Sequence, residues 1–178
     1  FSGGSAVFGT GFSGITLGNS TAGNVTVAGA LSLTTNSANI VSGGDITLNS
    51  GASFANSKAS GNLVVAATGK FVNDAGAAAL TTNSGRWVVY SNAPGANTFG
   101  SLDSGNLAYW NNTYGTLAPA SVGAGNRYVF ASNFVGGGAR VTTTNASKEY
   151  GSAAIDLSSN LSVTATAAGR FAIRDRVF

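Results

Sequence analysis

The feature that most constrains the fold is a phrase that recurs between Ile15 and about Ser91: a Gly-containing turn and then a short apolar triplet. Most triplets carry two apolar side chains around a small polar one, which is the period-2 pattern of a half-buried strand. They are Ile15-Thr16-Leu17, Val25-Thr26-Val27, Leu31-Ser32-Leu33, Ile46-Thr47-Leu48, Leu63-Val64-Val65 and Trp87-Val88-Val89. The pattern predicts a series of short strands separated by tight turns.

The turn phrases set the repeat length. Gly23-Asn24, Gly44-Asp45, Gly61-Asn62 and Gly85-Arg86 each precede a triplet, at intervals of 21, 17 and 24 residues. The mean of about 21 residues matches one coil of a solenoid. Strands this short bury their apolar side only when successive coils stack along an axis, and Gly and Asn tolerate the backbone angles of the corners. We therefore predict an all-β fold, a parallel β-helix (β-solenoid).

Composition separates this interpretation from a disordered linker. Gly occupies 26 positions and only 8% of residues are charged, against roughly 25% in an average soluble domain. Disorder usually requires low hydrophobicity together with high charge or abundant proline. Here proline occurs twice, and β-branched and aromatic residues recur throughout. Repetitive β structure fits this composition and disorder does not.

The pattern changes along the chain and predicts three parts. Residues 1–91 form the solenoid coils, residues 92–126 form an irregular excursion rich in Asn, Gly and Tyr, and residues 127–178 form further coils or a small C-terminal β lobe. Strand-like runs return in the last part at Tyr128–Phe130, Ala139–Thr144, Leu161–Ala165 and Phe171–Val177. Their spacing fits both more coils and a small antiparallel module.

One segment is more specific than composition. The run from Gly69 to Leu80, GKFVNDAGAAAL, is followed by Gly85–Ser91, GRWVVYS. These residues resemble the filamentous-haemagglutinin-like exoproteins, which are adhesins of Gram-negative bacteria exported by two-partner secretion. In that family a phrase close to F-x-N-x-A-G and then G-R-W-x-V-Y-S ends a run of β-helical coils. Gly85, Arg86, Trp87 and Tyr90 are the core and turn residues of this motif.

Two further stretches extend the resemblance to roughly residues 40–155. Tyr109–Gly115 with Gly123–Asn126 is similar to the segment that comes after the motif in such proteins, and Ala146–Gly151 resembles the opening of their small repeated β modules. The resemblance implies a β-helical fold, a place outside the bacterial cell or on its surface, and an export partner in the outer membrane. It does not imply a binding specificity.

Catalytic chemistry finds little support in the sequence. The chain has no His and no Cys, so the common nucleophile–base pairs and Cys-based metal sites are excluded. Asp45, Asp74 and Asp103 recur every 29 residues, but coils of about 21 residues would not bring them together as a carboxylate pair. We expect no enzymatic activity, no catalytic residue, no metal and no cofactor.

Two aromatic groups are candidates for ligand contact. Arg86-Trp87 fits a platform in which Trp stacks on a sugar and Arg binds a carboxylate. Strand alternation favours the other interpretation, with Trp87 and Val89 in the core and Arg86 and Val88 pointing outward. Tyr109, Trp110 and Tyr114 lie in the irregular stretch and are the candidate contact surface, although packing against the flank of the solenoid explains them at least as well.

The net charge of the chain does not indicate a particular class of partner. The formal net charge is +3, and three of the nine basic residues, Arg170, Arg174 and Arg176, lie in the last nine residues. They alternate with Phe171, Ile173 and Asp175, which favours a strand with one charged face over a nucleic-acid-binding arm. No apolar run is long enough for a helical membrane span. We expect neither a nucleic-acid partner nor a membrane span.

Two functions remain open. One is an adhesin-like segment that binds a host or abiotic surface, with the solenoid as a stalk and residues 92–126 as the contact surface. The other is a structural subunit that binds copies of itself through its terminal coils, because the unpaired strand edges of a short solenoid need caps or partners. Both are non-catalytic and extracellular.

Overall fold

The computed structural model describes residues 11–105, 107–133, 139–143 and 161–165, and the chain divides into two compact units, residues 1–134 and 135–178. In the first unit the described strands are β1 (Gly14–Asn19), β2 (Val25–Val27), β3 (Ala30–Leu33), β4 (Ser37–Ser42), β5 (Ile46–Leu48), β6 (Ser53–Ala59), β7 (Asn62–Ala67), β8 (Phe71–Asn73), β9 (Leu80–Asn83), β10 (Trp87–Ser91), β11 (Ala108–Tyr109) and β12 (Arg127–Phe130). Two short 3-10 helices, η1 (Pro94–Ala96) and η2 (Pro119–Ser121), interrupt them.

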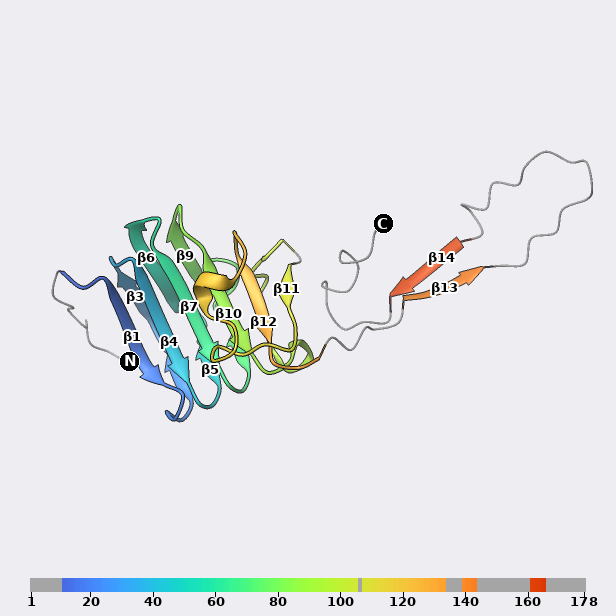
Figure 1. The fold of residues 1–178 in the computed structure, drawn as a ribbon, viewed down its shortest axis with the longest axis horizontal. Coiled ribbons are helices and arrows are strands. Elements are labelled where there is room, and N and C mark those ends of the chain that lie inside the picture. The colour runs from blue at the N-terminus through green and yellow to red at the C-terminus, as the bar shows by residue number, and fades with distance from the viewer. Residues whose placement is uncertain (1–10, 106, 134–138, 144–160, 166–178) are drawn as a thin grey trace, which may run out of the picture. The chain divides into compact units, whose positions relative to one another are not determined.

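The first unit is a β-solenoid of about five turns, and the predicted parallel β-helix is confirmed. The chain visits three sheets in rotation, so that β1, β2 and β3 form one turn and β4, β5 and β6 the next (Figure 1). Sheet A has the order β1-β4-β7-β10-β12-β11, sheet B the order β2-β5-β8, and sheet C the order β3-β6-β9. All these strands pair in parallel, as expected for stacked coils.

The interior is filled by aligned side chains from successive turns. One rank in sheet A consists of Ile40, Val65, Val89 and Tyr128, which are all fully buried. Sheets B and C contribute Ile46, Leu48, Phe54 and Phe71, also fully buried. Burying apolar side chains provides the main favourable term in folding, and here each turn is stabilised chiefly by its two neighbours.

The corners explain why Asn or Asp follows Gly in the turn phrases. The Asn24 Oδ1 atom accepts a hydrogen bond from the Asp45 backbone N–H at 2.9 Å, and the Asp45 Oδ1 atom accepts one from Lys70 N–H at 2.8 Å. At another corner Asn62 Oδ1 accepts from Arg86 N–H at 3.1 Å. Each of these side chains thus satisfies a backbone donor of the next turn, where the chain leaves the strand ladder.

One turn of the solenoid contains more residues than the spacing of the turn phrases predicts. Aligned residues in β1, β4, β7 and β10 are separated by 23, 25 and 24 residues, whereas the predicted mean is about 21. The difference arises because the turn phrases belong to two corners. Gly23 and Gly44 precede strands of sheet B, and Gly61 and Gly85 precede strands of sheet A. The interval of 17 residues therefore joins different corners.

The last turn is out of chain order. Strand β12 lies between β10 and β11, although β11 comes first in the sequence (Figure 1). The chain therefore first forms β11, which is the edge strand of sheet A, and then leaves the stack. It returns as β12, which lies between β10 and β11. The expected excursion, residues 92–126, is only partly outside the solenoid. Thr98 still pairs with Val72 of β8, whereas residues 110–126 run outside the stack.

The second unit contains an antiparallel pair, β13 (Ala139–Thr143) and β14 (Leu161–Ala165). Val141 faces Val163 at its centre. The predicted module opening at Ala146–Gly151, the strand at Phe171–Val177 and its alternating arginines lie outside the described residues.

Candidate binding groove

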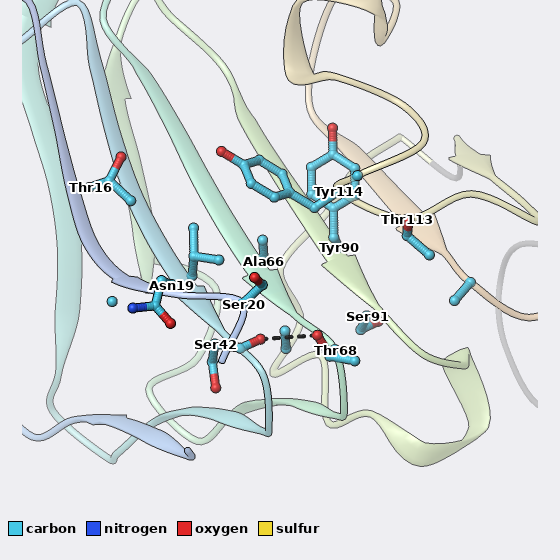
Figure 2. Close-up of a pocket in the computed structure, with 15 residues that line it drawn as sticks. Thr16, Asn19, Ser20, Ser42, Ala66, Thr68, Tyr90, Ser91, Thr113 and Tyr114 are labelled. Carbon is cyan, nitrogen blue, oxygen red and sulfur yellow. Dashed lines mark hydrogen bonds between the residues drawn. The ribbon is translucent and has the colours of Figure 1, made fainter. Parts of the chain in front are cut away.

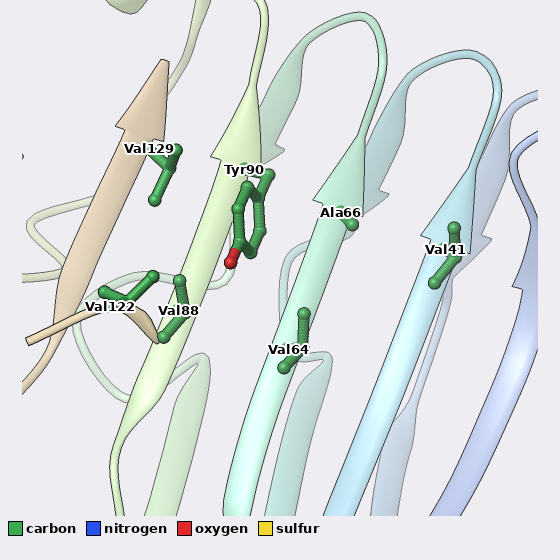
Figure 3. Close-up of a cluster of buried hydrophobic side chains, with 7 residues drawn as sticks. All are labelled: Val41, Val64, Ala66, Val88, Tyr90, Val122 and Val129. Atoms are coloured by element: carbon green, nitrogen blue, oxygen red, sulfur yellow. The ribbon is translucent and has the colours of Figure 1, made fainter. Parts of the chain in front are cut away.

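Sheet A differs from the other sheets because its outer face is also apolar and covered. Strand β10 is buried along its whole length, and β7 from its second residue onward. The outward side chains form a second apolar cluster, distinct from the interior ranks, with one member from the crossing chain (Figure 3). Its buried members are Val41, Val64, Ala66, Val88, Tyr90, Val122 and Val129. We call residues 110–126, which cross this face, the cover loop.

Polar contacts hold the cover loop on the sheet. The Arg86 guanidinium donates to the backbone carbonyl oxygens of Val122 at 2.6 Å and Pro119 at 2.7 Å, and also to that of Gly123. The Tyr90 hydroxyl donates to the Leu117 carbonyl at 2.9 Å. Hydrogen bonds with a charged donor are stronger than neutral ones, so Arg86 is the main polar anchor of the loop.

The motif residues Gly85, Arg86, Trp87 and Tyr90 therefore lie where the cover loop meets sheet A. Trp87 is buried in the interior, where its ring meets that of Tyr128 edge-on with 5.1 Å between centroids, while Arg86 reaches outward to the loop. Gly85 packs against the backbone of Gly61 so closely that a β-carbon would collide with its carbonyl oxygen. Arg86 and Trp87 thus do not form a joint ligand platform: the strand places them on opposite sides.

The three aromatic residues of the candidate contact surface are half-buried and do not form one exposed patch. Tyr109 belongs to β11 and its hydroxyl accepts a hydrogen bond from Gly123 N–H at 3.0 Å. Trp110 packs on Phe130, with ring centroids 4.9 Å apart. Tyr114 meets Tyr90 edge-on at 5.4 Å. Tyr114 also borders a hollow of the surface.

That hollow is a groove of about 550 Å³ between the cover loop and the first turn. Its floor is the outward rank Gly18, Val41 and Ala66, which are aligned neighbours in β1, β4 and β7. Figure 2 shows Tyr90 and Tyr114 at one end and Asn19 with Ser20 at the other. The volume lies within the ~300–1,000 Å³ of small-molecule sites.

The polar groups of the groove are held in place by local hydrogen bonds. Asn19 Oδ1 accepts from the backbone N–H and the hydroxyl of Thr21, both at 2.8 Å. Thr16 Oγ1 accepts from Asn39 Nδ2 at 3.0 Å. Thr68 donates from its hydroxyl to the Ser42 carbonyl at 3.2 Å (Figure 2). The rim is thus ordered before any ligand arrives.

The groove is electrically neutral. Among the described residues, its lining contains no Asp, Glu, Lys or Arg. Burial, reinforced by the neighbouring Tyr114 and opposed by Arg86, raises the pKa of Tyr90 above its ordinary value of 10.0, so this phenol keeps its proton well into the alkaline range. The site offers hydroxyl, amide and aromatic groups only.

Sequence reasoning missed the groove floor and the covered face. A signal was present, because strands buried on both faces form continuous apolar runs instead of alternating ones. Leu63–Ala67 and Trp87–Tyr90 are such runs, whereas the triplets of sheets B and C alternate. The runs indicate that something covers sheet A, although not which segment does so.

Catalytic and metal-binding clusters are not found in the described part of the chain. No group of three or more His, Cys, Asp or Glu residues lies together there. Asp45 and Asp74 lie at different corners, directly before β5 and directly after β8. Within the same residues, no helix has the length and hydropathy to cross a membrane.

Comparisons with known proteins add no relative. No protein-family model, no curated protein and no solved structure matches the chain. Inferences about function rest on the residues themselves.

Proposed function

We propose that this protein is a non-catalytic, adhesin-like surface protein of the bacterial exterior, in which the solenoid presents the groove on sheet A to a binding partner. The observation that carries the proposal is the groove itself, a hollow of about 550 Å³ on a face stiffened by parallel strands. A site formed on strands keeps its geometry better than one formed on loops.

The chemistry of the lining supports binding rather than catalysis. Hydroxyl, amide and aromatic groups hold and orient a ligand, but the described lining contains no carboxylate, imidazole or thiol to act as acid, base or nucleophile. The extracellular part of the proposal rests on the resemblance of Gly85–Ser91 to exported adhesins. In this chain Arg86 and Tyr90 of that phrase anchor the cover loop, which forms one wall of the groove.

Adherence of protein-coated beads to cultured host cells and to abiotic surfaces tests the proposal. Thr16→Trp fills the groove from an exposed position of β1. Ser32→Trp is the matched control, because Ser32 is equally an exposed outward residue of the same turn but lies on sheet C.

We expect Thr16→Trp to reduce adherence at least tenfold, and Ser32→Trp to retain it within about twofold, since a bulky ring blocks the groove only in the first variant. Equal adherence of Thr16→Trp and wild type on every surface tested would contradict the proposal. Circular dichroism of each variant checks that the solenoid is intact.

Self-assembly through terminal coils is the second candidate, and one observation favours it. Four inward apolar residues of the first turn, Ile15, Leu17, Val25 and Leu31, are only half-buried, whereas their neighbours in the second turn are fully buried. Strands β1, β2 and β3 are also the edges of their described sheets. Uniform fibres in negative-stain micrographs would favour this function over adhesion, and dispersed short particles would exclude it.

A further inference from the structure

We propose that the groove on sheet A binds a neutral carbohydrate chain that lies along the solenoid axis, with a sugar ring against Tyr114. This inference rests on the proposed function, since it assigns a ligand class to the surface proposed there to bind. It is supported by the direction of the groove, the distribution of its polar groups and its lack of charge.

The direction of the groove fits an elongated ligand. Its lining comes from β1, β4, β7 and β10 and then from the cover loop, so it runs across the strands. Neighbouring strands are ~4.8 Å apart, so three intervals span about 14 Å. Gly18, at one end of the floor, has a φ of +81°, and a β-carbon there would collide with the Val41 carbonyl oxygen, so this position requires glycine.

The distribution of polar groups fits a molecule with apolar faces and polar edges. The floor is apolar, and Val41 and Ala66 are 5% and 3% exposed. Hydroxyl and amide groups lie around it, with Thr16, Asn19 and Ser20 on the side of the first turn and Tyr114 on the other (Figure 2). A sugar ring has this arrangement, because its C–H faces pack on aromatic and aliphatic groups while its hydroxyls donate and accept at the rim.

Other ligand classes fit less well. An acidic or basic ligand would lose water without gaining an opposite charge, since the described lining carries none. An alkyl chain would cover the apolar floor, but it could not use the remaining hydrogen-bonding capacity of the rim hydroxyls and the Asn19 amide, which costs free energy for each such group that becomes buried. A neutral carbohydrate can both pack on the apolar floor and form hydrogen bonds with the polar rim.

Calorimetric titration with short linear oligosaccharides tests the ligand class. The probes are neutral hexose and N-acetylhexosamine oligomers, with a sulfated oligosaccharide and a medium-chain alcohol as comparators. Amide chemical shifts of Ser42 and Ala66 report whether a bound probe occupies the groove. The variants are Thr16→Trp and Tyr114→Ala, and Ser32→Trp is the control on sheet C.

We expect at least one neutral oligosaccharide to bind and to shift the amides of Ser42 and Ala66. Thr16→Trp should abolish this binding, Tyr114→Ala should weaken it about tenfold, the upper range for one aromatic contact, and Ser32→Trp should leave it unchanged. Because the groove is uncharged, affinity should change less than about twofold with salt.

Three outcomes would overturn the inference: no neutral probe binds, the sulfated probe or the alcohol binds the groove more tightly, or Ser32→Trp weakens binding as much as Thr16→Trp does. These outcomes are separable from failure of the proposed function. If Thr16→Trp abolishes adherence while no neutral probe binds, the groove is adhesive but its ligand class is wrong. If neutral probes bind in the groove while Thr16→Trp adheres normally, the ligand class stands and the adhesive role fails.

Discussion

Arg86 shows how one side chain can determine the position of a whole segment. Its guanidinium binds three backbone carbonyls of the cover loop, at Pro119, Val122 and Gly123. These carbonyls lie around η2, where the chain has left the strand ladder and has few backbone donors nearby. Arginine suits this task because its planar group presents several donors in fixed directions. The outward orientation of Arg86 follows from strand alternation, but its acceptors lie more than 30 residues away and leave no local signal in the sequence.

Replacing Arg86 by Ala should lower the free energy of unfolding by about 2 kcal/mol, because its charge-assisted bonds to three carbonyls are lost; the Pro119 carbonyl keeps the Val122 N–H as a donor. Arg86→Lys should recover part of this loss. Urea unfolding followed by circular dichroism measures both. Arg127→Ala is the control, since within the described residues the Arg127 side chain donates to no carbonyl beyond that of the adjacent Asn126, and a change there equal to that of Arg86→Ala would refute the anchoring role.

Gly85 provides a second test at this scale. Gly85→Ala should destabilise the solenoid by about 1–3 kcal/mol, since its β-carbon collides with Gly61 and the two turns must separate. Gly23→Ala is a matched control at another corner, where nothing lies within 4 Å of the added carbon. Thermal unfolding of the two variants should therefore differ clearly, and equal melting temperatures would show that the close approach is not required.

The strands of sheet A have a different sequence pattern from those of sheets B and C. In sheets B and C the alternating triplets are sufficient to identify β2, β3 and β5, because water covers their outer sides. Strand β6 escapes this pattern, since the inward position after Phe54 holds the polar residue Asn56. Asn56 is buried but fully engaged: its amide contacts Thr35 and the Asn62 carbonyl. Such satisfied polar residues hide a strand from a hydrophobicity pattern.

Two tyrosines make the stability of β10 and β12 depend on alkaline pH. Burial raises the pKa of Tyr90, and burial together with Asp103 raises that of Tyr128, both from 10.0. The unfolded chain therefore loses these protons at lower pH than the folded chain. The stabilisation is complete below about pH 9 and decreases as pH rises past 10.

Urea unfolding at a series of pH values measures this dependence. Tyr90→Phe with Tyr128→Phe should flatten the decline above pH 10, while costing about 1 kcal/mol per lost hydroxyl bond at neutral pH, to Leu117 and Leu102 respectively. An undiminished decline in the double variant would assign the effect to other groups.

At the scale of the whole molecule, the stack should be least stable at its first turn. Stability in a solenoid is the sum of contacts between neighbouring turns, and four inward residues of the first turn, Ile15, Leu17, Val25 and Leu31, are half-buried. Amide hydrogen exchange should therefore be fastest in β1, β2 and β3 and slowest in β7 and β10. Leu17→Ala should speed exchange in the first turn alone, whereas Val89→Ala should speed it throughout. Uniform protection along the stack would contradict this gradient.

The overall architecture could be predicted because it is local: short strands, tight corners and a repeated interval. The order of the last strands could not, because nothing in β11 or β12 indicates which lies nearer to β10. The same holds for the groove, whose floor, Gly18, Val41 and Ala66, comes from three separate turns. None of these residues belongs to a recognisable motif in its own segment, and they come together only when the turns stack in register.

The inverted order of β11 and β12 has a consequence for how the chain folds. Coils can otherwise be added one after another as the chain becomes available, each on a finished template. Among the described strands, β11 pairs only with β12, so Ala108 and Tyr109 have no ladder to join until Arg127–Phe130 has arrived. Addition of coils in chain order therefore stops at β10: β12 has to pair with β10 before β11 can join the sheet.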